Sequence, residues 1–242
     1  MPSVVLEDAN PFGAEPLAVV GEYATDGRLV RHAALLSISM PLKRGSEPAV
    51  HQMCPPLALD PMIGEAQHAV GNFHPVHIVG YVEGLTRSDV KAMETWLARI
   101  SRRTPVIPRL RRGWDDRYLE HYILCPPVQP AAVDKKTGNP RFWRFSCVGL
   151  VLECYRHGAK INLLDWESPR FPRIHLRDFK DAYGEDMILA PRNLAKVGLS
   201  GQGPWPIALP GYLFHALHNR TAAAIRSEPP YLPTSTNETR FP

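Results

Sequence analysis

The stretch from residue 139 to residue 164 constrains the fold of this chain more than any other. Apolar side chains recur in it at the spacing of one helix face, at Cys147, Leu150, Val151, Cys154 and Tyr155. An aromatic and basic segment, 142–145, precedes this pattern, and Gly158 follows it as a normal helix end. The pattern therefore predicts a short helix that begins at Ser146 and Cys147, packs against a core and stops at Gly158.

Cys147 falls in the first turn of this predicted helix. Unpaired backbone N–H groups and the positive end of the helix dipole favour a thiolate there, and a thiolate is a nucleophile. Cysteine is also among the most buried residue types, and on an apolar helix face it usually serves packing. Cys154, farther inside the helix, fits that structural interpretation. The position of Cys147 at the helix start favours chemistry instead.

The length and composition of the chain predict one domain. A chain of 242 residues with 44% hydrophobic side chains suits a packed domain, which we expect over residues 1–226 with C-terminal elaboration. The 25 prolines indicate many irregular connections. Residues 227–242 are polar and rich in proline, so we expect a tail without a core of its own.

Charge and cysteine usage exclude several classes of protein. A net charge of +4, from 28 basic and 24 acidic residues, is too small and dispersed to predict a nucleic-acid partner. The four cysteines form no CxxC pair and resemble neither a disulfide framework nor a zinc site, so we expect no metal and no cofactor. We find no signal peptide and no apolar run of about 18 residues that could span a membrane. These features predict a cytoplasmic protein with reduced thiols.

Apolar runs and turn signals predict the order of the remaining elements. We expect strands at residues 17–20, 28–40, 49–54, 76–82 and 118–125, a loop at 128–140, and helices near 173–183, 190–194 and 211–224. A further helix begins near Thr86, where Thr86 and Asp89 form a capping box, and ends before Pro105. Strands therefore precede the Cys147 helix, and helices follow it.

The segment from Phe145 to Gly158 resembles the nucleophile helix of the NlpC/P60 papain-like superfamily. Strands that carry histidine come before the cysteine, which is similar to the circularly permuted branch, the lecithin:retinol acyltransferase-like and YiiX/YaeF-like proteins. The resemblance implies an α+β fold with a papain-like core, in which an antiparallel sheet in permuted strand order packs against the nucleophile helix. It covers about residues 28–165 and leaves the C-terminal third, with residues 166–226, outside it.

The resemblance also implies a catalytic site. Cys147 would attack an acyl carbonyl, His32 would accept the thiol proton, and His51 would orient that imidazole as the third member of a triad. The backbone N–H of Cys147 would help to hold the oxyanion. Ser146 departs from the pattern, because the family usually has Asp or Asn before the cysteine.

Two alternatives stay open at this point. His77 lies on an equally suitable strand, with His121 as the residue that would orient it, although we favour His32. The chain could also be a noncatalytic papain-like module that binds or scaffolds. As an enzyme it would be a thiol-dependent hydrolase or acyltransferase, and its partner would be a peptide, a peptidoglycan-derived peptide or an acyl lipid.

Overall fold

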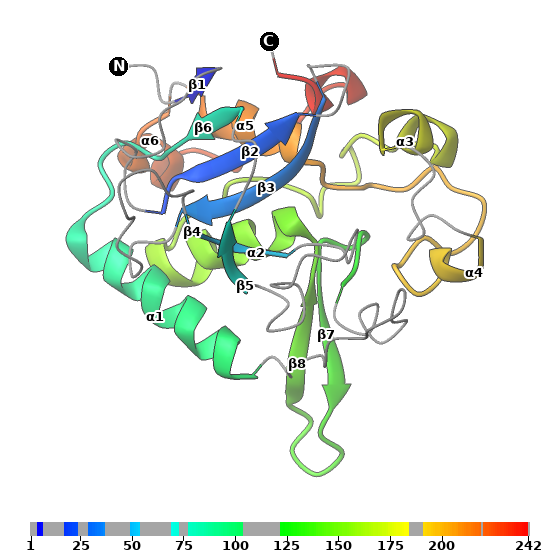
Figure 1. Cartoon of the computed structure of the whole chain (residues 1–242), viewed down its shortest axis with the longest axis horizontal. Helices are drawn as coiled ribbons and strands as arrows, with labels where there is room; N and C mark the ends of the chain where they lie inside the picture. Colours follow the sequence, from blue (N-terminus) through cyan, green and yellow to red (C-terminus); the bar gives the residue numbers. More distant parts are fainter. Residues whose placement is uncertain are drawn as a thin grey trace.

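An antiparallel sheet of six strands forms the centre of the fold (Figure 1). The computed structural model describes residues 4–6, 17–23, 29–36, 49–53, 69–72, 77–103, 122–183, 191–218 and 220–241. In chain order the strands are β1 (Val4–Leu6), β2 (Val19–Tyr23), β3 (Val30–Leu36), β4 (Ala49–Gln52), β5 (Ala69–Asn72) and β6 (Ile78–Gly80). Their spatial order is β1-β6-β2-β3-β4-β5. The predicted α+β class with an antiparallel sheet is confirmed.

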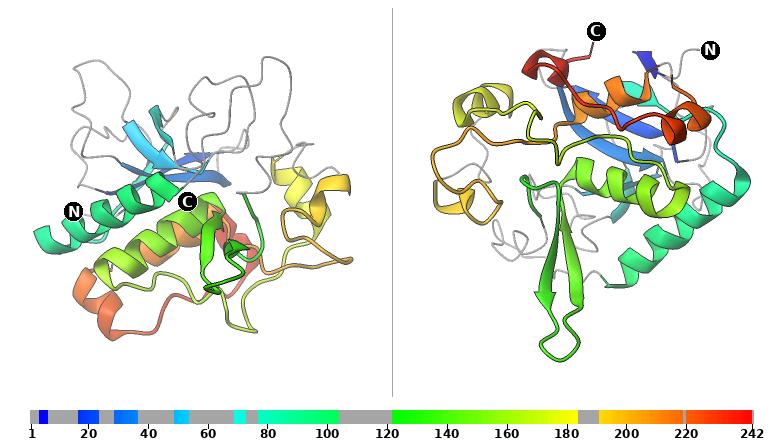
Figure 2. Two further views of the ribbon diagram at one scale, coloured as in Figure 1. Left: turned by 90° about the horizontal axis from the view of Figure 1, so that it is seen from below. Right: turned by 180° about the vertical axis from the view of Figure 1, so that it is seen from behind.

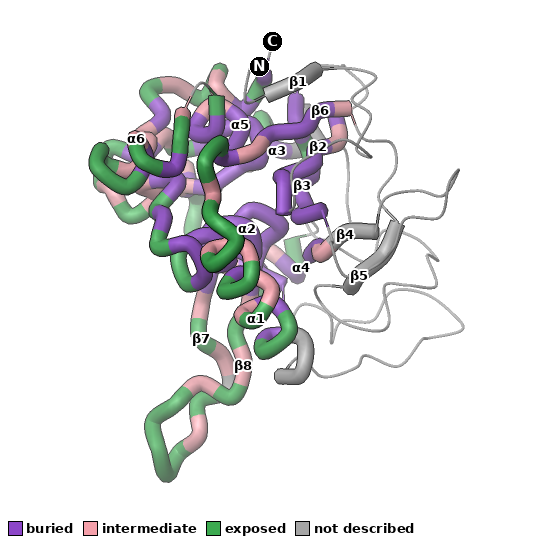
Figure 3. The backbone as a smooth tube through the Cα atoms, turned by 90° about the vertical axis from the view of Figure 1, so that its left-hand side faces the viewer, coloured by how far each residue is buried: buried purple, intermediate pink, exposed green. Residues whose placement is uncertain are grey.

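Helices α2 (Cys147–Cys154) and α5 (Pro210–Leu217) cover one face of this sheet, and α1 (Arg87–Arg103) packs beside α2 (Figure 2). The core lies between them and the sheet. All eight residues of α2 are buried, as the purple tube of Figure 3 shows. The amphipathic stripe of α1 contributes Met93, Leu97 and Ile100 to the same core. The sequence thus predicts α1 and α2 correctly.

Side-chain alternation divides strand β3 between the two faces of the sheet. Ala33 and Leu35 belong to the core beneath the helices, whereas Ala34 and Leu36 belong to a smaller cluster on the opposite face. This alternation is the period-two rule of an extended strand. It decides on which side of the sheet each candidate histidine lies.

The helix that begins at Cys147 does not stop at Gly158 as predicted. The chain continues as a π-helical turn, Tyr155–Ala159, and ends at Lys160, whose backbone is left-handed (φ 59°). Gly158 is instead a point of close approach, because a Cβ atom there would lie 2.3 Å from Cγ of Met93 on α1. The glycine therefore allows α1 and the helix end to pack closely.

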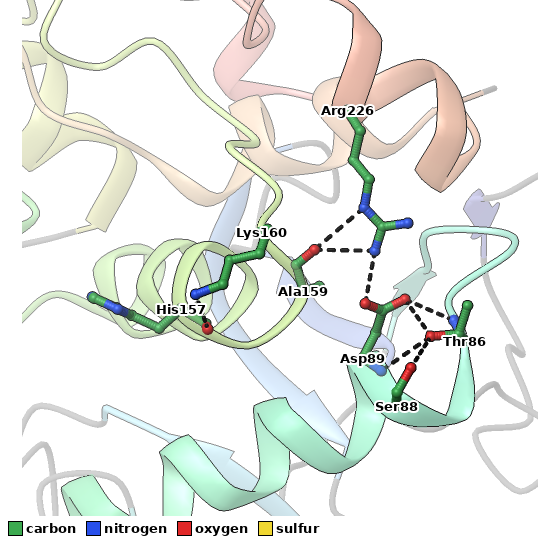
Figure 4. A network of polar contacts seen from close by, with 7 residues as sticks. All are labelled: Thr86, Ser88, Asp89, His157, Ala159, Lys160 and Arg226. Carbon is green, nitrogen blue, oxygen red and sulfur yellow. Dashed lines mark hydrogen bonds and ion pairs between the residues drawn. The ribbon is translucent and has the colours of Figure 1, made fainter.

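A hydrogen-bond network fixes the beginning of α1 (Figure 4). Asp89 N–H donates to the Thr86 hydroxyl at 3.1 Å, and Thr86 N–H donates to the Asp89 carboxylate at 2.8 Å, which confirms the predicted capping box. Arg226 binds the same carboxylate at 2.8 Å and donates to the carbonyl of Ala159. Partial burial raises the pKa of the Asp89 carboxyl, but the Arg226 and Thr86 contacts outweigh it and leave the pKa below its ordinary value.

The segment before α2 is a hairpin that the sequence analysis missed. The predicted loop at 128–140 contains strand β7 (Val128–Val133), which pairs with β8 (Pro140–Phe145) in a separate two-stranded sheet. The strand predicted at 118–125 is wrong over its described part, since Tyr122 makes one isolated bridge to Phe145 and residues 123–125 are irregular. The sequence pattern did not predict the hairpin because each strand contains a proline, Pro130 in β7 and Pro140 in β8, and proline usually interrupts a strand.

The C-terminal third contributes helices α3 (Leu176–Tyr183), α4 (Pro191–Leu194) and α6 (Ala222–Ser227). The residues after α6 pack on the body and do not form the separate tail that we expected. Phe241 is buried in the main core, and Tyr231 bridges to Leu164. These two apolar residues, ten positions apart in a polar segment, hold the C-terminal residues against the rest of the protein.

Candidate active site

Cys147 lies at the start of α2, as the sequence predicts. Ser146 is the N-cap, with extended backbone, and its hydroxyl accepts the Gly149 N–H at 2.9 Å. The Ser146 carbonyl accepts the N–H of Leu150. This cap explains the departure at Ser146, because serine is as good an N-cap as the expected Asp or Asn.

Three backbone N–H groups favour the thiolate form of Cys147. They belong to Cys147 and Val148 on the first turn of α2 and to Ala33 on strand β3, and each lowers the pKa of the thiol. Burial has the larger, opposite effect and raises the pKa of the thiol to about 11. The thiol is therefore protonated at neutral pH in this conformation, and a base would have to remove its proton.

His51 lies on the face of the sheet that carries Cys147. It is directly opposite Leu35 in the register of β3 and β4, and directly opposite residues share a face. Ala33, whose N–H lowers the pKa of the Cys147 thiol, is its diagonal neighbour, and such neighbours stand about 7–8 Å apart, within reach of long side chains. Burial lowers the pKa of the His51 imidazole to about 4.

His32 lies on the opposite face of the sheet. It is opposite Glu22, and its Nε2 is 3.0 Å from Oε1 of Gln52, which is opposite Ala34 of the second cluster. Burial lowers the pKa of His32 to about 4, the Gln52 hydrogen bond raises it, and Arg31 lowers it further. The register thus brings His51, and not His32, to the side of Cys147.

Among the described residues, no hydrogen bond links the Cys147 sulfur to an imidazole. The alternative base, His77, is held elsewhere: its Nδ1 accepts the Tyr23 N–H at 2.9 Å, and its ring stacks on Tyr23. His121, the residue that would orient His77, lies outside the described residues.

Two parts of the site were not predicted. One is Gln52, the buried partner of His32. Because successive side chains of a strand point to opposite faces, the position of Gln52 next to His51 could have indicated that these two side chains lie on different faces of the sheet. The Ala33 N–H carries no sequence signal at all, because its role depends on how α2 crosses β3.

Comparison with known proteins identified no relative of this chain. No family model, curated protein or solved structure matches the chain. The site must therefore be interpreted from its own chemistry. In the part of the chain that the structure describes, no group of three or more histidine, cysteine or acidic side chains could hold a metal ion. No helix there has the length and apolar character needed to cross a membrane.

Proposed function

We propose that the protein is a cysteine hydrolase or acyltransferase of the permuted NlpC/P60 type, with Cys147 as its nucleophile. One observation carries the proposal: Cys147 lies at a helix start, where three backbone N–H groups, one of them from strand β3, favour its thiolate form. Groups of this kind stabilise negative charge, whether on a thiolate or on the oxygen of a tetrahedral intermediate. The three described cysteines are free thiols, as expected in a reducing compartment such as the cytoplasm.

The reaction begins with the protonated thiol. As the sulfur bonds to the acyl carbon, its proton moves to an imidazole and the carbonyl electrons move onto oxygen, near the N–H groups of Cys147 and Val148. The intermediate expels its leaving group, which takes the proton from the imidazolium, and a thioester remains on Cys147. Water, or another acceptor in a transferase, then gives a proton to the imidazole and attacks the thioester carbonyl, and the expelled Cys147 thiolate takes that proton back from the imidazolium.

We assign the base to His51 and a supporting role to His32, which reverses the order that the resemblance implies. The support is the strand register, which puts His51 opposite Leu35 and His32 on the Gln52 side. With a pKa of about 4, the His51 imidazole is neutral at physiological pH and can accept a proton, but a pKa nearer that pH would make it a stronger base. The substrate class remains a peptide, a peptidoglycan-derived peptide or an acyl lipid.

Turnover of a substrate panel tests the proposal. Wild-type protein and the variants Cys147→Ala, His51→Ala and His32→Ala are assayed on a peptide amide, a muropeptide and an acyl ester. We expect turnover of one class, abolished in Cys147→Ala and reduced about 10²–10⁴-fold in His51→Ala. Cys125→Ala, which removes a partly buried thiol elsewhere, is the matched control and retains activity. Activity that survives Cys147→Ala refutes the proposal.

A second candidate function is a noncatalytic papain-like module. The observation in its favour is the protonated, buried thiol, whose pKa of about 11 and lack of a described imidazole bond suit a packing role. A module predicts no turnover of any class in the panel. It also predicts that Cys147→Ala lowers the free energy of unfolding and has no other effect.

A further inference from the structure

The β7–β8 hairpin extends away from the body of the protein (Figures 1 and 3). Its two strands form a sheet of their own, and the described side chains buried in it, Val128 and Phe145, lie at its base. An isolated two-stranded hairpin is marginally stable in water. The distal part of the hairpin therefore has no core of its own, and the body of the protein does not bury its side chains.

This hairpin carries the exposed large hydrophobic side chains of the described structure. They are Val133, with 51% of its surface exposed, and Trp143, with 37% exposed. The indole ring is large and amphipathic, and tryptophan is enriched where apolar material meets water. Both side chains are accessible to a partner.

The hairpin is also locally basic. Residues 128–145 contain four basic residues and one acidic residue, a net charge of +3, against +4 for the whole chain. Lys135, Lys136 and Arg141 line a shallow hollow of about 320 Å³ together with Val133 and Asp134. Asp134 pairs with Arg141 at 3.8 Å, and the two lysines beside them can donate charge-assisted hydrogen bonds to the phosphate of an anionic headgroup.

Hydrogen bonds fix the conformation of the hairpin tip. The Asp134 carboxylate accepts the N–H groups of Lys136 at 2.9 Å and Thr137 at 3.0 Å, and the Asp134 N–H donates to the Asn139 carbonyl at 2.8 Å. Gly138 allows the left-handed turn with φ 70°. A tip that is ordered before binding loses little entropy when it binds.

We propose that this hairpin docks the protein on an anionic bilayer surface. Lys135, Lys136 and Arg141 would contact lipid phosphates. Trp143, opposite Pro130 in the hairpin register, and Val133, opposite Pro140, lie on opposite faces of the ribbon and would enter the headgroup layer on its two sides. Positive charge beside a tryptophan matches such a surface. Binders of single-stranded nucleic acid instead present aromatic rings in succession along a groove. The inference does not depend on catalysis, since Cys147 has no part in it.

Sedimentation with vesicles tests the docking. Full-length protein is mixed with phosphatidylcholine vesicles with or without phosphatidylserine, at low and high salt. We expect binding to the phosphatidylserine vesicles alone and its loss at high salt. The variant Lys135→Ala/Lys136→Ala/Arg141→Ala should bind on the order of a hundredfold more weakly, since each basic residue contributes roughly fivefold. Val133→Asn/Trp143→Ser should lose roughly tenfold.

A matched variant controls for net charge. Arg170→Ala/Arg177→Ala/Arg192→Ala removes three exposed basic residues elsewhere and should bind like the wild type. Circular dichroism melting establishes that each variant is folded. Equal loss in both triple variants, or no binding of wild type to anionic vesicles, overturns the proposal. Binding of wild type to single-stranded RNA or to an acidic peptide in place of vesicles overturns it as well.

Discussion

At the scale of single residues, Gly149 determines how the start of α2 meets the hairpin. A Cβ atom at this position would lie 1.8 Å from the carbonyl oxygen of Pro127. The same carbonyl accepts the N–H of Ser146, the N-cap of the Cys147 helix. The glycine therefore keeps Cys147 in its place against β3.

The variant Gly149→Ala should lower the free energy of unfolding by about 3 kcal/mol or more, because backbone atoms must move to admit the methyl group. Gly84→Ala is the control: its Cβ would have nothing within 4 Å, and the left-handed backbone alone should cost about 1–2 kcal/mol. Urea unfolding measures both. Equal losses in the two variants would contradict the close contact at Gly149.

A substitution at Gln52 should change the protonation of His32. Gln52→Glu keeps the shape of the side chain and places a carboxylate where the amide oxygen now lies 3.0 Å from Nε2. An opposite charge at that distance favours the imidazolium, so the His32 pKa should rise well above its present value of about 4. Imidazole NMR shifts against pH measure it, and an unchanged pKa would mean that the two side chains are apart in solution.

At the scale of elements, Arg226 on α6 joins α1 to the end of the helix that begins at Cys147. Removing it in Arg226→Ala leaves the Asp89 carboxylate and the Ala159 carbonyl without their shared donor. The free energy of unfolding should fall by about 1–2 kcal/mol. Arg177→Ala, which removes an exposed pair with Asp178, is the control and should change it by less than about 0.5 kcal/mol. Chemical denaturation distinguishes the two outcomes, and equal effects would contradict a structural role for this network.

Some elements could be predicted because their signals are local. The capping box at Thr86, the apolar stripe of α1 and the periodicity after Cys147 each involve neighbours within one or two helical turns. Strand β7 could not be predicted in this way. Its one proline, Pro130, is typical of a loop, while its pairing with β8 joins residues 7 to 17 positions apart.

Only the part of the candidate site that depends on local sequence signals could be predicted. The place of Cys147 at a helix start follows from local periodicity, but the side on which each histidine lies follows from strand register. A bulge between Glu22 and Tyr23 shifts the pairing of β2 with β3 beside His32. A shift of one residue exchanges the faces of a strand. The sequence alone does not specify such a shift.

At the scale of the whole molecule, the imidazoles of the buried His32 and the partly buried His51 make stability depend on pH. His32 and His51 bind protons near pH 4 in the folded protein and near pH 6.5 when unfolded. Between these values the unfolded state holds more protons, so the free energy of unfolding decreases as the pH falls, by up to about 3 kcal/mol for His32. Urea unfolding at about pH 7 and about pH 4 measures the difference.

The double variant His32→Gln/His51→Gln should lose most of this pH dependence. The exposed His175→Gln is the control and should retain it. A wild-type protein that is equally stable at both pH values would show that these two imidazoles are solvated.

The central claim is that Cys147 forms a thioester with the assistance of His51. Intact-protein and peptide mass spectrometry after brief exposure to an activated acyl ester tests it directly. We expect one acyl group per chain, located on Cys147, absent in Cys147→Ala, formed much more slowly in His51→Ala and retained in Cys125→Ala. Acyl groups spread over Cys125, Cys147 and Cys154, or acylation of Cys147 at an unchanged rate in His51→Ala, would contradict it.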